Sequence, residues 1–489
     1  MAPDAASSRR RLISTYYDTP DLALKRRGLT LRVREQGGRF IQTVKTGDLA
    51  PGADLLRRGE WEDELGENRP DPHASESGGH LPDGVGDNLQ PLFATDITRT
   101  TVAIEPLPDT RIEAATDEGE IRTASGDGTE PISEIELELR CGDPAVLYDV
   151  AMRLLEVAPI RIEARSKSER GYRLGEGTAS APPVAHAEPV VLDPTMSVEA
   201  ALQEIGRACL AHLLRNEAAA LAMQPEGVHQ MRVAERRIRS AVAAFKKLIP
   251  PAERRWVSVE LRCVVDILGS ARNLDVFATE LLQPARAALA DEAGLDDLAA
   301  ALEAARREAY ARVGNAIVSE RHAGGMLRLS HWFEACAWRA APGEPSAELV
   351  SPIGDLAPRL LDRRWREVRK RGRRFGRQTP RQWHKLRIAA KKLRYTIELL
   401  ESLFDQDDVK RFVRRLKRLQ DDLGYANDVR VARELLPDLA KEVPSQRAGI
   451  RVLEWHEKDL AKGERKIRKR LRRLKLAAPF WRRRRRAGD

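Results

Sequence analysis

The chain has 489 residues, of which 42% are hydrophobic, so it can bury a substantial core and is long enough for more than one domain. Its net charge is +10 and its pI is about 9.5, a balance that favours an anionic partner without identifying it. Four scattered cysteines without a CxxC pair argue against a zinc site or a disulfide framework. No apolar run reaches about 18 residues, so we expect a soluble, cytoplasmic protein.

Short alternating segments separated by turns occur throughout residues 12–175 and predict an α+β fold with an antiparallel sheet. The clearest strand signals lie at residues 29–34, 39–45 and 132–140. Residues 66–88 hold Gly, Pro, Asp, His and Ser with almost no apolar side chains. They predict a long, mobile surface loop between two strands.

Charged residues recur at every second position in several of these segments, which puts them on one face of each strand. The sets are Arg32 with Arg34, Glu60 with Glu62, and Glu134 with Glu136 and Glu138. Three carboxylates on one face repel one another unless cations lie among them, and such oxygen ligands suit Mg²⁺ or Mn²⁺. The alternative interpretation is the solvated polar face of an amphipathic sheet.

Together with Tyr17-Asp-Thr-Pro-Asp-Leu-Ala-Leu, Leu31-Arg-Val-Arg34 and Val44-Lys45, these segments resemble the CYTH family, the triphosphate tunnel metalloenzymes, over about residues 11–174. The resemblance implies an eight-stranded barrel in which a metal-activated water attacks a triphosphate. By position it implies triphosphate contacts at Arg32, Arg34, Lys45, Arg99, Lys167 and Arg170. It implies acidic metal ligands at Glu60 or Glu62, Asp117, Glu134, Glu136 and Glu138, and it assigns no catalytic side chain.

The family normally opens with a Glu-x-Glu-x-Lys strand and a helix, whereas only sixteen residues precede Tyr17 here and none fits that pattern. We therefore expect an incomplete, N-terminally truncated barrel that lacks part of the metal site, while most phosphate-binding positions remain. A misplaced start codon and a true truncation would look the same.

The composition changes at residues 176–194, which are rich in Ala, Pro and Gly and predict a linker after an N-terminal domain of residues 1–175. Beyond the linker, the sequence predicts long amphipathic helices. They lie at residues 198–221, 228–248, 254–268, 295–312 and from 356 to near the end. We expect an all-α domain over residues 195–482, followed by a basic tail at 483–489.

Two motifs occur twice in the same order within this domain. The first reads His229-Gln-Met-Arg-Val-Ala-Glu-Arg-Arg-Ile-Arg239 and returns as His384-Lys-Leu-Arg-Ile-Ala-Ala-Lys-Lys-Leu-Arg394. The second reads Leu268-Gly-Ser-Ala-Arg-Asn-Leu-Asp275 and returns as Leu423-Gly-Tyr-Ala-Asn-Asp428. Motifs shared in a common order predict duplicated helical bundles, at about residues 195–345 and 350–482.

In each copy of the first motif, the histidine and the basic residues recur at i, i+3, i+7 and i+10, within an arc of about 80°. We expect an opposing apolar face formed by Met231, Val233 and Ile238, and by Leu386, Ile388 and Leu393. A row of cations roughly 15 Å long suits a linear anion with repeating phosphates. A single charged helix face can also be solvated surface, and each histidine a packed or capping residue. Asp275 and Asp428 could cap helices or orient basic side chains.

The paired helices and their Leu-Gly elements resemble the CHAD family, named for conserved histidines in an α-helical domain, over about residues 194–481. The resemblance implies two helical bundles related by a pseudo-twofold axis, whose basic faces bind inorganic polyphosphate without catalysis. By position it implies polyphosphate contacts at His229, Arg232, Arg236, Arg239, His384, Arg387, Lys391 and Arg394.

We therefore expect a protein that binds polyphosphate through its helical domain and triphosphate or chain ends through its N-terminal domain, in association with polyphosphate granules. The alternative is an active inorganic triphosphatase that uses Mg²⁺ or Mn²⁺ to hydrolyse tripolyphosphate or polyphosphate ends. Nucleic-acid binding ranks below both, because aromatic residues are only 5% and no motif that reads RNA or DNA occurs. No membrane partner is expected, and the sequence indicates neither oligomeric state nor chain-length preference.

Overall fold

A computed structural model of the chain describes residues 7–46, 59–177, 181–339, 346–373 and 380–482. The chain divides into two compact units, Met1–Ala185 with Met326–Ala335, and His186–Gly325 with Cys336–Asp489. The basic tail at residues 483–489 lies outside the described residues. Among the described helices, none is both long enough and apolar enough to cross a membrane.

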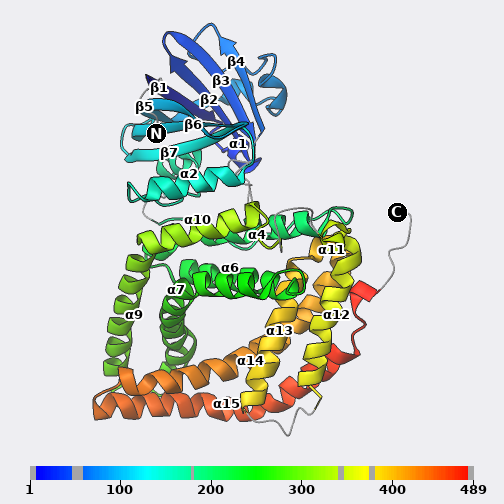
Figure 1. Cartoon of the computed structure of the whole chain (residues 1–489). Helices are drawn as coiled ribbons and strands as arrows, with labels where there is room; N and C mark the ends of the chain where they lie inside the picture. The colour runs from blue at the N-terminus through cyan, green and yellow to red at the C-terminus, as the bar shows by residue number, and fades with distance from the viewer. Residues whose placement is uncertain (1–6, 47–58, 178–180, 340–345, 374–379, 483–489) are drawn as a thin grey trace. The chain divides into compact units, whose positions relative to one another are not determined.

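The first unit is built around an antiparallel sheet (Figure 1). Its strands are β1 (Ser7–Asp18), β2 (Leu29–Gln36), β3 (Arg39–Thr46), β4 (Gly59–Leu65), β5 (Gln90–Leu107), β6 (Thr110–Thr123) and β7 (Thr129–Cys141). Its helices are α1 (Ala23–Arg26), α2 (Ala145–Leu155) and α3 (Lys167–Gly175), with single turns η1 (Gly78–His80) and η2 (Gly86–Asn88). The strand order is β4-β3-β2-β1-β5-β6-β7, and the sheet is not closed, which confirms the expected incomplete barrel.

Alternation along β2 separates charged from apolar side chains at this strand. Leu31 and Val33 are buried, whereas Arg32 and Arg34 point to the other side of the sheet. Leu31 packs with Leu24, Val44 and Val85 in one apolar cluster. A second cluster around Tyr16, Phe93, Ile97 and Tyr172 joins β1, β5 and α3.

The segment between β4 and β5 is fastened to the apolar side of the sheet, in contrast to the mobile loop that its composition predicts. The Asp63 carboxylate accepts hydrogen bonds from the Ser77 backbone N–H at 2.7 Å and from the Ser77 hydroxyl at 2.6 Å. The Gln42 amide donates to the Ser77 hydroxyl at 2.8 Å and accepts from the Asp71 backbone N–H at 2.9 Å. Val85, one of the few apolar residues of the segment, is buried and anchors it by packing.

The Tyr-Asp-Thr-Pro segment at the end of β1 has a structural role. Asp18 is fully buried, and its carboxylate accepts hydrogen bonds from the backbone N–H groups of Thr19, Leu24 and Lys25 at 2.7–2.9 Å. The Tyr172 hydroxyl of α3 donates to the same carboxylate at 3.0 Å. Asp18 therefore closes the turn into α1 and ties α3 to β1.

The second unit is largely helical, as the sequence predicts. Its first half contains α4 (Val198–Leu214), α5 (Glu217–Leu221), α6 (Pro225–Ala244), α7 (Pro251–Val276), a π-helical turn η3 (Phe277–Leu282), α8 (Gln283–Ala288) and α9 (Leu295–Ile317). The chain then forms α10 (Glu320–Glu334), most of which is counted with the first unit. Next come α11 (Ala347–Val350), α12 (Ile353–Arg371), α13 (Pro380–Glu398) and η4 (Glu401–Leu403). It ends with α14 (Gln406–Leu439), α15 (Val443–Leu476) and η5 (Phe480–Arg482).

A short antiparallel bridge joins the residues that precede α4 and α12. Ser197 pairs with Pro352, the Val198 N–H donates to the Ser351 carbonyl, and the Ile353 N–H donates to the Met196 carbonyl, both at 2.9 Å. The spacing from Ser197 to Pro352 equals the spacing between the two copies of each sequence motif. Each bridge residue therefore pairs with its own counterpart in the other repeat, as a pseudo-twofold axis through the bridge requires.

Candidate functional site

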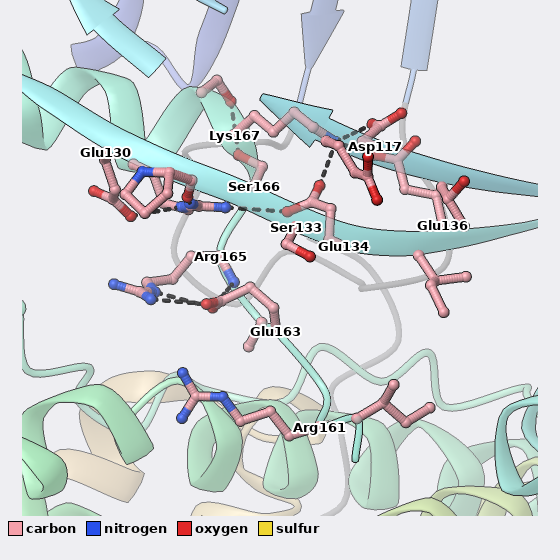
Figure 2. A pocket seen from close by; sticks show the side chains of 18 of the residues that line it. Asp117, Glu130, Ser133, Glu134, Glu136, Arg161, Glu163, Arg165, Ser166 and Lys167 are labelled. Carbon is pink, nitrogen blue, oxygen red and sulfur yellow. Dashed lines mark hydrogen bonds and ion pairs between the residues drawn. The ribbon is translucent and has the colours of Figure 1, made fainter. Parts of the chain in front are cut away.

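A cavity of about 920 Å³ lies against the charged face of the sheet in the first unit (Figure 2). Strands β1, β2, β3, β6 and β7, helix α3 and the segment before α3 all contribute to its lining. Among the residues predicted to bind phosphate or metal, those lining the cavity are Arg32, Lys45, Asp117, Glu134, Glu136, Lys167 and Arg170. The structure thus brings basic and acidic candidates to one cavity.

Three carboxylates form an acidic cluster in this cavity: Asp117 on β6, and Glu134 and Glu136 on β7. Asp117 lies directly opposite Glu134 in the β6–β7 register, and Glu136 follows on the same face two residues later. One oxygen of each carboxylate lies within 4.8 Å of the others. Asp117 is completely buried, whereas Glu136 keeps about half of its side-chain surface exposed.

Two basic side chains each pair with more than one carboxylate of the acidic cluster. Arg99 on β5 donates two hydrogen bonds of 2.7 Å to Asp117 and one of 2.5 Å to Glu136. Lys167 at the start of α3 pairs with all three carboxylates (Figure 2). Burial alone would raise the pKa of Glu136, but the charges of Lys167 and Arg99 outweigh it and lower this pKa to about 2. Glu136 is therefore ionised at neutral pH.

A basic patch formed by Arg32, Arg34 and Lys45 occupies β2 and β3 on the same face of the sheet. Burial, followed by repulsion from Arg32, lowers the pKa of Arg34 to about 10. Among the described residues, Arg34 has no carboxylate in ion-pair distance and donates only a long hydrogen bond of 3.4 Å to the Ser14 hydroxyl. Its guanidinium is thus available to an anion.

The remaining acidic candidates lie apart from the cluster. Glu60 on β4 pairs with Lys45 at 2.9 Å and with Arg32 at 3.4 Å. Glu62 accepts a hydrogen bond of 2.9 Å from the Thr43 hydroxyl, and Glu138 pairs with Arg140 at 2.5 Å. These three carboxylates therefore meet protein cations or hydroxyls rather than the acidic cluster.

Arg170, predicted to contact triphosphate, is instead engaged by β7. Its guanidinium donates to Glu130 at 2.7 Å, to the Pro131 carbonyl at 2.6 Å and to Glu134 at 3.0 Å. The side chain is only 9% exposed. In this conformation Arg170 anchors α3 to β7 beside the acidic cluster.

The acidic cluster fits a divalent metal ion by the chemistry of its donors. All its atoms are hard carboxylate oxygens, which Mg²⁺ and Mn²⁺ prefer, and they come from two rigid paired strands. Asp117, Glu134 and Glu136 would hold such an ion, with Glu60, Glu62 and Glu138 outside the cluster.

In the second unit, the predicted basic stripe lies on α6 and α13. Met231, Ile238, Leu386 and Leu393 are completely buried behind it, as predicted. Val233 is only partly buried and Ile388 is 38% exposed, so the apolar faces are narrower than expected. The guanidinium of Arg236 on α6 donates a hydrogen bond of 2.8 Å to the Tyr395 hydroxyl of α13, which brings the two stripes together.

Positive side chains crowd one another at this junction. Burial and the neighbouring Arg236 lower the pKa of Arg232 to about 10. Burial, followed by Arg387 and Arg236, lowers the pKa of Lys391 to about 7. Burial also lowers the pKa of Arg387. Among the described residues, no ion pair joins any of these four cations to a carboxylate.

The outer end of each stripe is neutralised within its own helix. Arg239 pairs with Glu235 at 2.7 Å, and Arg394 pairs with Glu398 at 3.0 Å. Burial raises the pKa of both glutamates against the opposing pull of their arginines. Arg239 and Arg394 are therefore less available to an external anion than the cations at the centre.

The histidines differ between the two repeats. Burial, together with the positive charge of Arg272, lowers the pKa of His229 to about 4, so this ring is neutral at physiological pH. The Nδ1 atom of His384 lies 3.2 Å from the Asn427 side-chain oxygen. Arg272 and Asn427 occupy matched positions in the repeated Leu-Gly elements. Aligning the two motifs could therefore have predicted that each lies near the histidine of its own repeat.

The Leu-Gly element also has a packing role in the first repeat. The guanidinium of Arg232 donates to the Leu268 carbonyl at 3.2 Å, and a Cβ at Gly269 would lie 3.1 Å from the same guanidinium. Asp275 and Asp428 lie inside α7 and α14, so of their two predicted roles, helix cap and partner of a basic side chain, the first is wrong. Asp275 instead accepts hydrogen bonds from Arg306 and Tyr310 of α9 at 2.8–3.0 Å.

Residues 3–172 match the CYTH domain family, and residues 204–437 match the CHAD domain family. The chain joins a CYTH domain to a C-terminal CHAD domain. The CYTH family is metal-dependent, which agrees with the donors of the acidic cluster.

An inorganic triphosphatase of Haemophilus influenzae is 36% identical to this chain over 167 residues. The match covers 33% of this chain and 45% of that protein, so the chain spans less than half of the relative's length. The crystal structure of the CHAD domain from the plant Ricinus communis is similar with a TM-score of 0.52 and 27% identity. That similarity covers 59% of this chain and 96% of the plant domain.

Proposed function

We propose that this protein binds inorganic polyphosphate through its CHAD domain and holds triphosphate or chain ends in its CYTH domain. The observation that carries the first part is the group of cations Arg232, Arg236, Arg387 and Lys391, none of which has a carboxylate partner among the described residues. Burial and repulsion within the group lower the pKa of Arg232, Arg387 and Lys391. Such crowding costs free energy until an anion neutralises it. A polyanion is the ligand that satisfies several of them at once.

The pseudo-twofold relation of the stripes favours polyphosphate over single-stranded nucleic acid. A phosphate chain has no direction, so it presents the same groups to both halves of a twofold site. A nucleic-acid strand is directional and would also call for aromatic stacking platforms. Tyr395, the aromatic residue at the junction, is buried and already contacts Arg236, so it cannot stack on a base.

Binding can be tested with the purified full-length chain and fluorescently labelled polyphosphate. The variant Arg232→Gln/Arg387→Gln is expected to bind more than about tenfold more weakly, because each arginine loses charge-assisted hydrogen bonds. The matched control is Arg286→Gln/Arg312→Gln. It removes Arg286 of α8, which is already paired with Asp296, and Arg312 of α9, which is already paired with Glu308. Equal affinity of both variants would contradict the proposed site.

A second activity, metal-dependent inorganic triphosphatase, is favoured by the acidic cluster beside the basic patch and by the related triphosphatase. A bound divalent metal would supply Lewis-acid activation of the phosphate and of an attacking water. Arg32, Arg34 and Lys45 would bind and orient the phosphate chain, with Arg99 beside the acidic cluster holding Asp117 and Glu136 in place.

Hydrolysis can be tested by phosphate release from tripolyphosphate with and without Mg²⁺ or Mn²⁺. If the enzyme is active, Glu136→Gln should reduce release by more than about 100-fold, since even outer-shell partners of metal ligands cost about 10- to 100-fold. Glu138→Gln removes a neighbouring carboxylate outside the cluster and should leave release nearly unchanged. Absence of release in the wild type would leave the CYTH domain as a binding module.

A further inference from the structure

Lys167 points into the acidic cluster (Figure 2). Its Nζ lies 2.8 Å from an Asp117 oxygen and 2.7 Å from a Glu136 oxygen, and it also pairs with Glu134. The side chain is only 11% exposed. One ammonium group therefore engages all three carboxylates of the cluster, although a phosphate contact is the role expected for this position.

A divalent ion and this ammonium need the same oxygen lone pairs. The three oxygens lie within 4.8 Å of one another, which suits one central cation. Mg²⁺ requires its ligands at about 2.0–2.1 Å, so it cannot share the centre with an ammonium at hydrogen-bond distance. Metal binding at the cluster thus requires Lys167 to withdraw.

The backbone at Lys167 is held in place, so only the side chain can move. Ser166 caps α3 by accepting a hydrogen bond of 3.1 Å from the Glu169 N–H, and the Glu169 carboxylate accepts one of 3.1 Å from the Ser166 N–H. Arg170 fastens the same turn to β7. Withdrawal without a new anionic partner would leave a nearly buried ammonium unpaired, which is strongly unfavourable.

The other carboxylates that line the cavity are poor partners for a displaced ammonium. Glu130 and Glu163 are already paired with Arg170 and Arg165, and Glu118 follows Asp117 on the other face of β6. Arg32 and Lys45 line the same cavity as Lys167 and already share Glu60. A phosphate chain bound by this basic patch would bring oxygen anions into the cavity. It would thereby supply the partner that Lys167 needs on leaving the carboxylates.

We propose that Lys167 is an internal competitor of the divalent metal, so that metal and phosphate chain bind cooperatively to the CYTH domain. The phosphate draws the ammonium away and opens the three carboxylates. By linkage, the metal strengthens phosphate binding by the same factor. This inference rests on the metal site proposed above and identifies how that site is regulated.

The test is a titration of the full-length chain with Mn²⁺, followed by the Mn²⁺ electron paramagnetic resonance signal. The wild type should bind Mn²⁺ weakly, and Lys167→Met should bind it about tenfold more tightly or better, because the competing charge is gone. Lys167→Arg keeps the charge and should resemble the wild type. Lys25→Met removes a lysine of the same domain that is paired with Glu176 and does not line the cavity, so it should also resemble the wild type.

The second arm repeats the titration with a tripolyphosphate analogue whose bridging oxygens are methylene groups, at controlled free Mn²⁺. The analogue should tighten Mn²⁺ binding by the wild type about tenfold or more and change that of Lys167→Met little. A cooperative thermal unfolding transition without Mn²⁺ shows that each variant is folded.

Equal Mn²⁺ affinity of the wild type and Lys167→Met, with both binding tightly, would overturn the inference and leave the metal site intact. Failure of every form to bind Mn²⁺, with and without the analogue, would overturn both the inference and the proposed triphosphatase. Polyphosphate binding by the CHAD domain is measured separately and is independent of either outcome.

Discussion

Lys391 stands out among single residues because its charge is only half retained near neutral pH. The charged groups that face it are Arg387 and Arg394 on its own helix, Arg236 on α6 and Asp428 on α14. Burial and the arginines lower its pKa from 10.5 to about 7, against the weaker opposing effect of Asp428. The free protein therefore loses this positive charge as the pH rises through about 7.

A bound polyanion favours the charged form, so polyphosphate binding should take up protons above pH 7. We expect affinity to be greatest below pH 7 and to fall as the pH rises toward 8, with no contribution from His229, whose pKa is about 4. Calorimetric titration in buffers of different ionisation enthalpy measures the protons taken up. Lys391→Met should remove this uptake; uptake that persists in the variant would assign it to another group.

Asp18 shows how a residue within a family motif can serve the fold alone. Asp18→Ala leaves three backbone N–H groups and the Tyr172 hydroxyl without their acceptor in a fully buried place. We expect a loss of about 3 kcal/mol in the free energy of unfolding, measured by urea denaturation of the full-length chain. The exposed neighbour Asp21 pairs with Arg26 at the surface, and Asp21→Ala should lower the free energy of unfolding far less than Asp18→Ala. Similar losses for both would refute the structural role of Asp18.

At the scale of elements, α3 connects the core of the sheet to the acidic cluster. Gly171 lets this helix approach β5, since a Cβ there would lie 2.1 Å from the Phe93 ring. The helix carries Lys167 and Arg170 on the turn before Gly171. Displacement of α3 therefore alters both the packing of Phe93 and the cations at the cluster.

We expect Gly171→Ala to lower the free energy of unfolding by about 1–3 kcal/mol through overpacking, and to weaken Mn²⁺ or tripolyphosphate binding as well. Gly175→Ala in the same helix is the control, because its Cβ would meet only the Leu92 carbonyl at 3.8 Å. Thermal denaturation and a binding titration on each variant measure the two effects. Unchanged stability of Gly171→Ala would show that α3 has room to move.

Local patterns were sufficient to predict the elements but not the pairing between them. The alternation in β2 correctly placed Arg32 and Arg34 on one face. It could not show that β4 and β7 are the two edges of the sheet. That order depends on β1 lying at the centre and pairing with both β2 and β5, which are far apart in the sequence. For that reason Glu60 and Glu134 shared one predicted metal site, whereas the structure places them on opposite edge strands.

The same limit applies in the CHAD domain. The spacing of basic residues within each motif predicted a stripe on each helix. The contact of Tyr395 with Arg236 could not be predicted, because it depends on the packing of α6 against α13. Whether a cation is free or paired also depends on its surroundings. Arg239 and Arg236 are equivalent in the sequence pattern, yet only Arg239 has an acidic partner one helical turn away.

For the whole molecule, the two repeats should contribute comparably to polyphosphate binding and to its dependence on salt. Replacing both Arg232 and Arg387 by glutamine should lower the salt slope of the logarithm of the binding constant by about 2, if each releases about one counterion. Replacing both Arg239 and Arg394 should change the slope little, since Glu235 and Glu398 already neutralise them. Equal slopes for the two variants would show that the ion pairs open on binding.

The bridge between Ser197 and Pro352 also bears on how such a molecule can arise. Each repeat supplies one backbone donor and one backbone acceptor to this bridge. The first repeat supplies the Val198 N–H and the Met196 carbonyl, and the second supplies the Ile353 N–H and the Ser351 carbonyl. Two identical chains of a single repeat can therefore form the same two hydrogen bonds around a true symmetry axis. Fusion of two such chains preserves that contact, and each copy is then free to diverge, as Arg272 and Asn427 have done at one matched position.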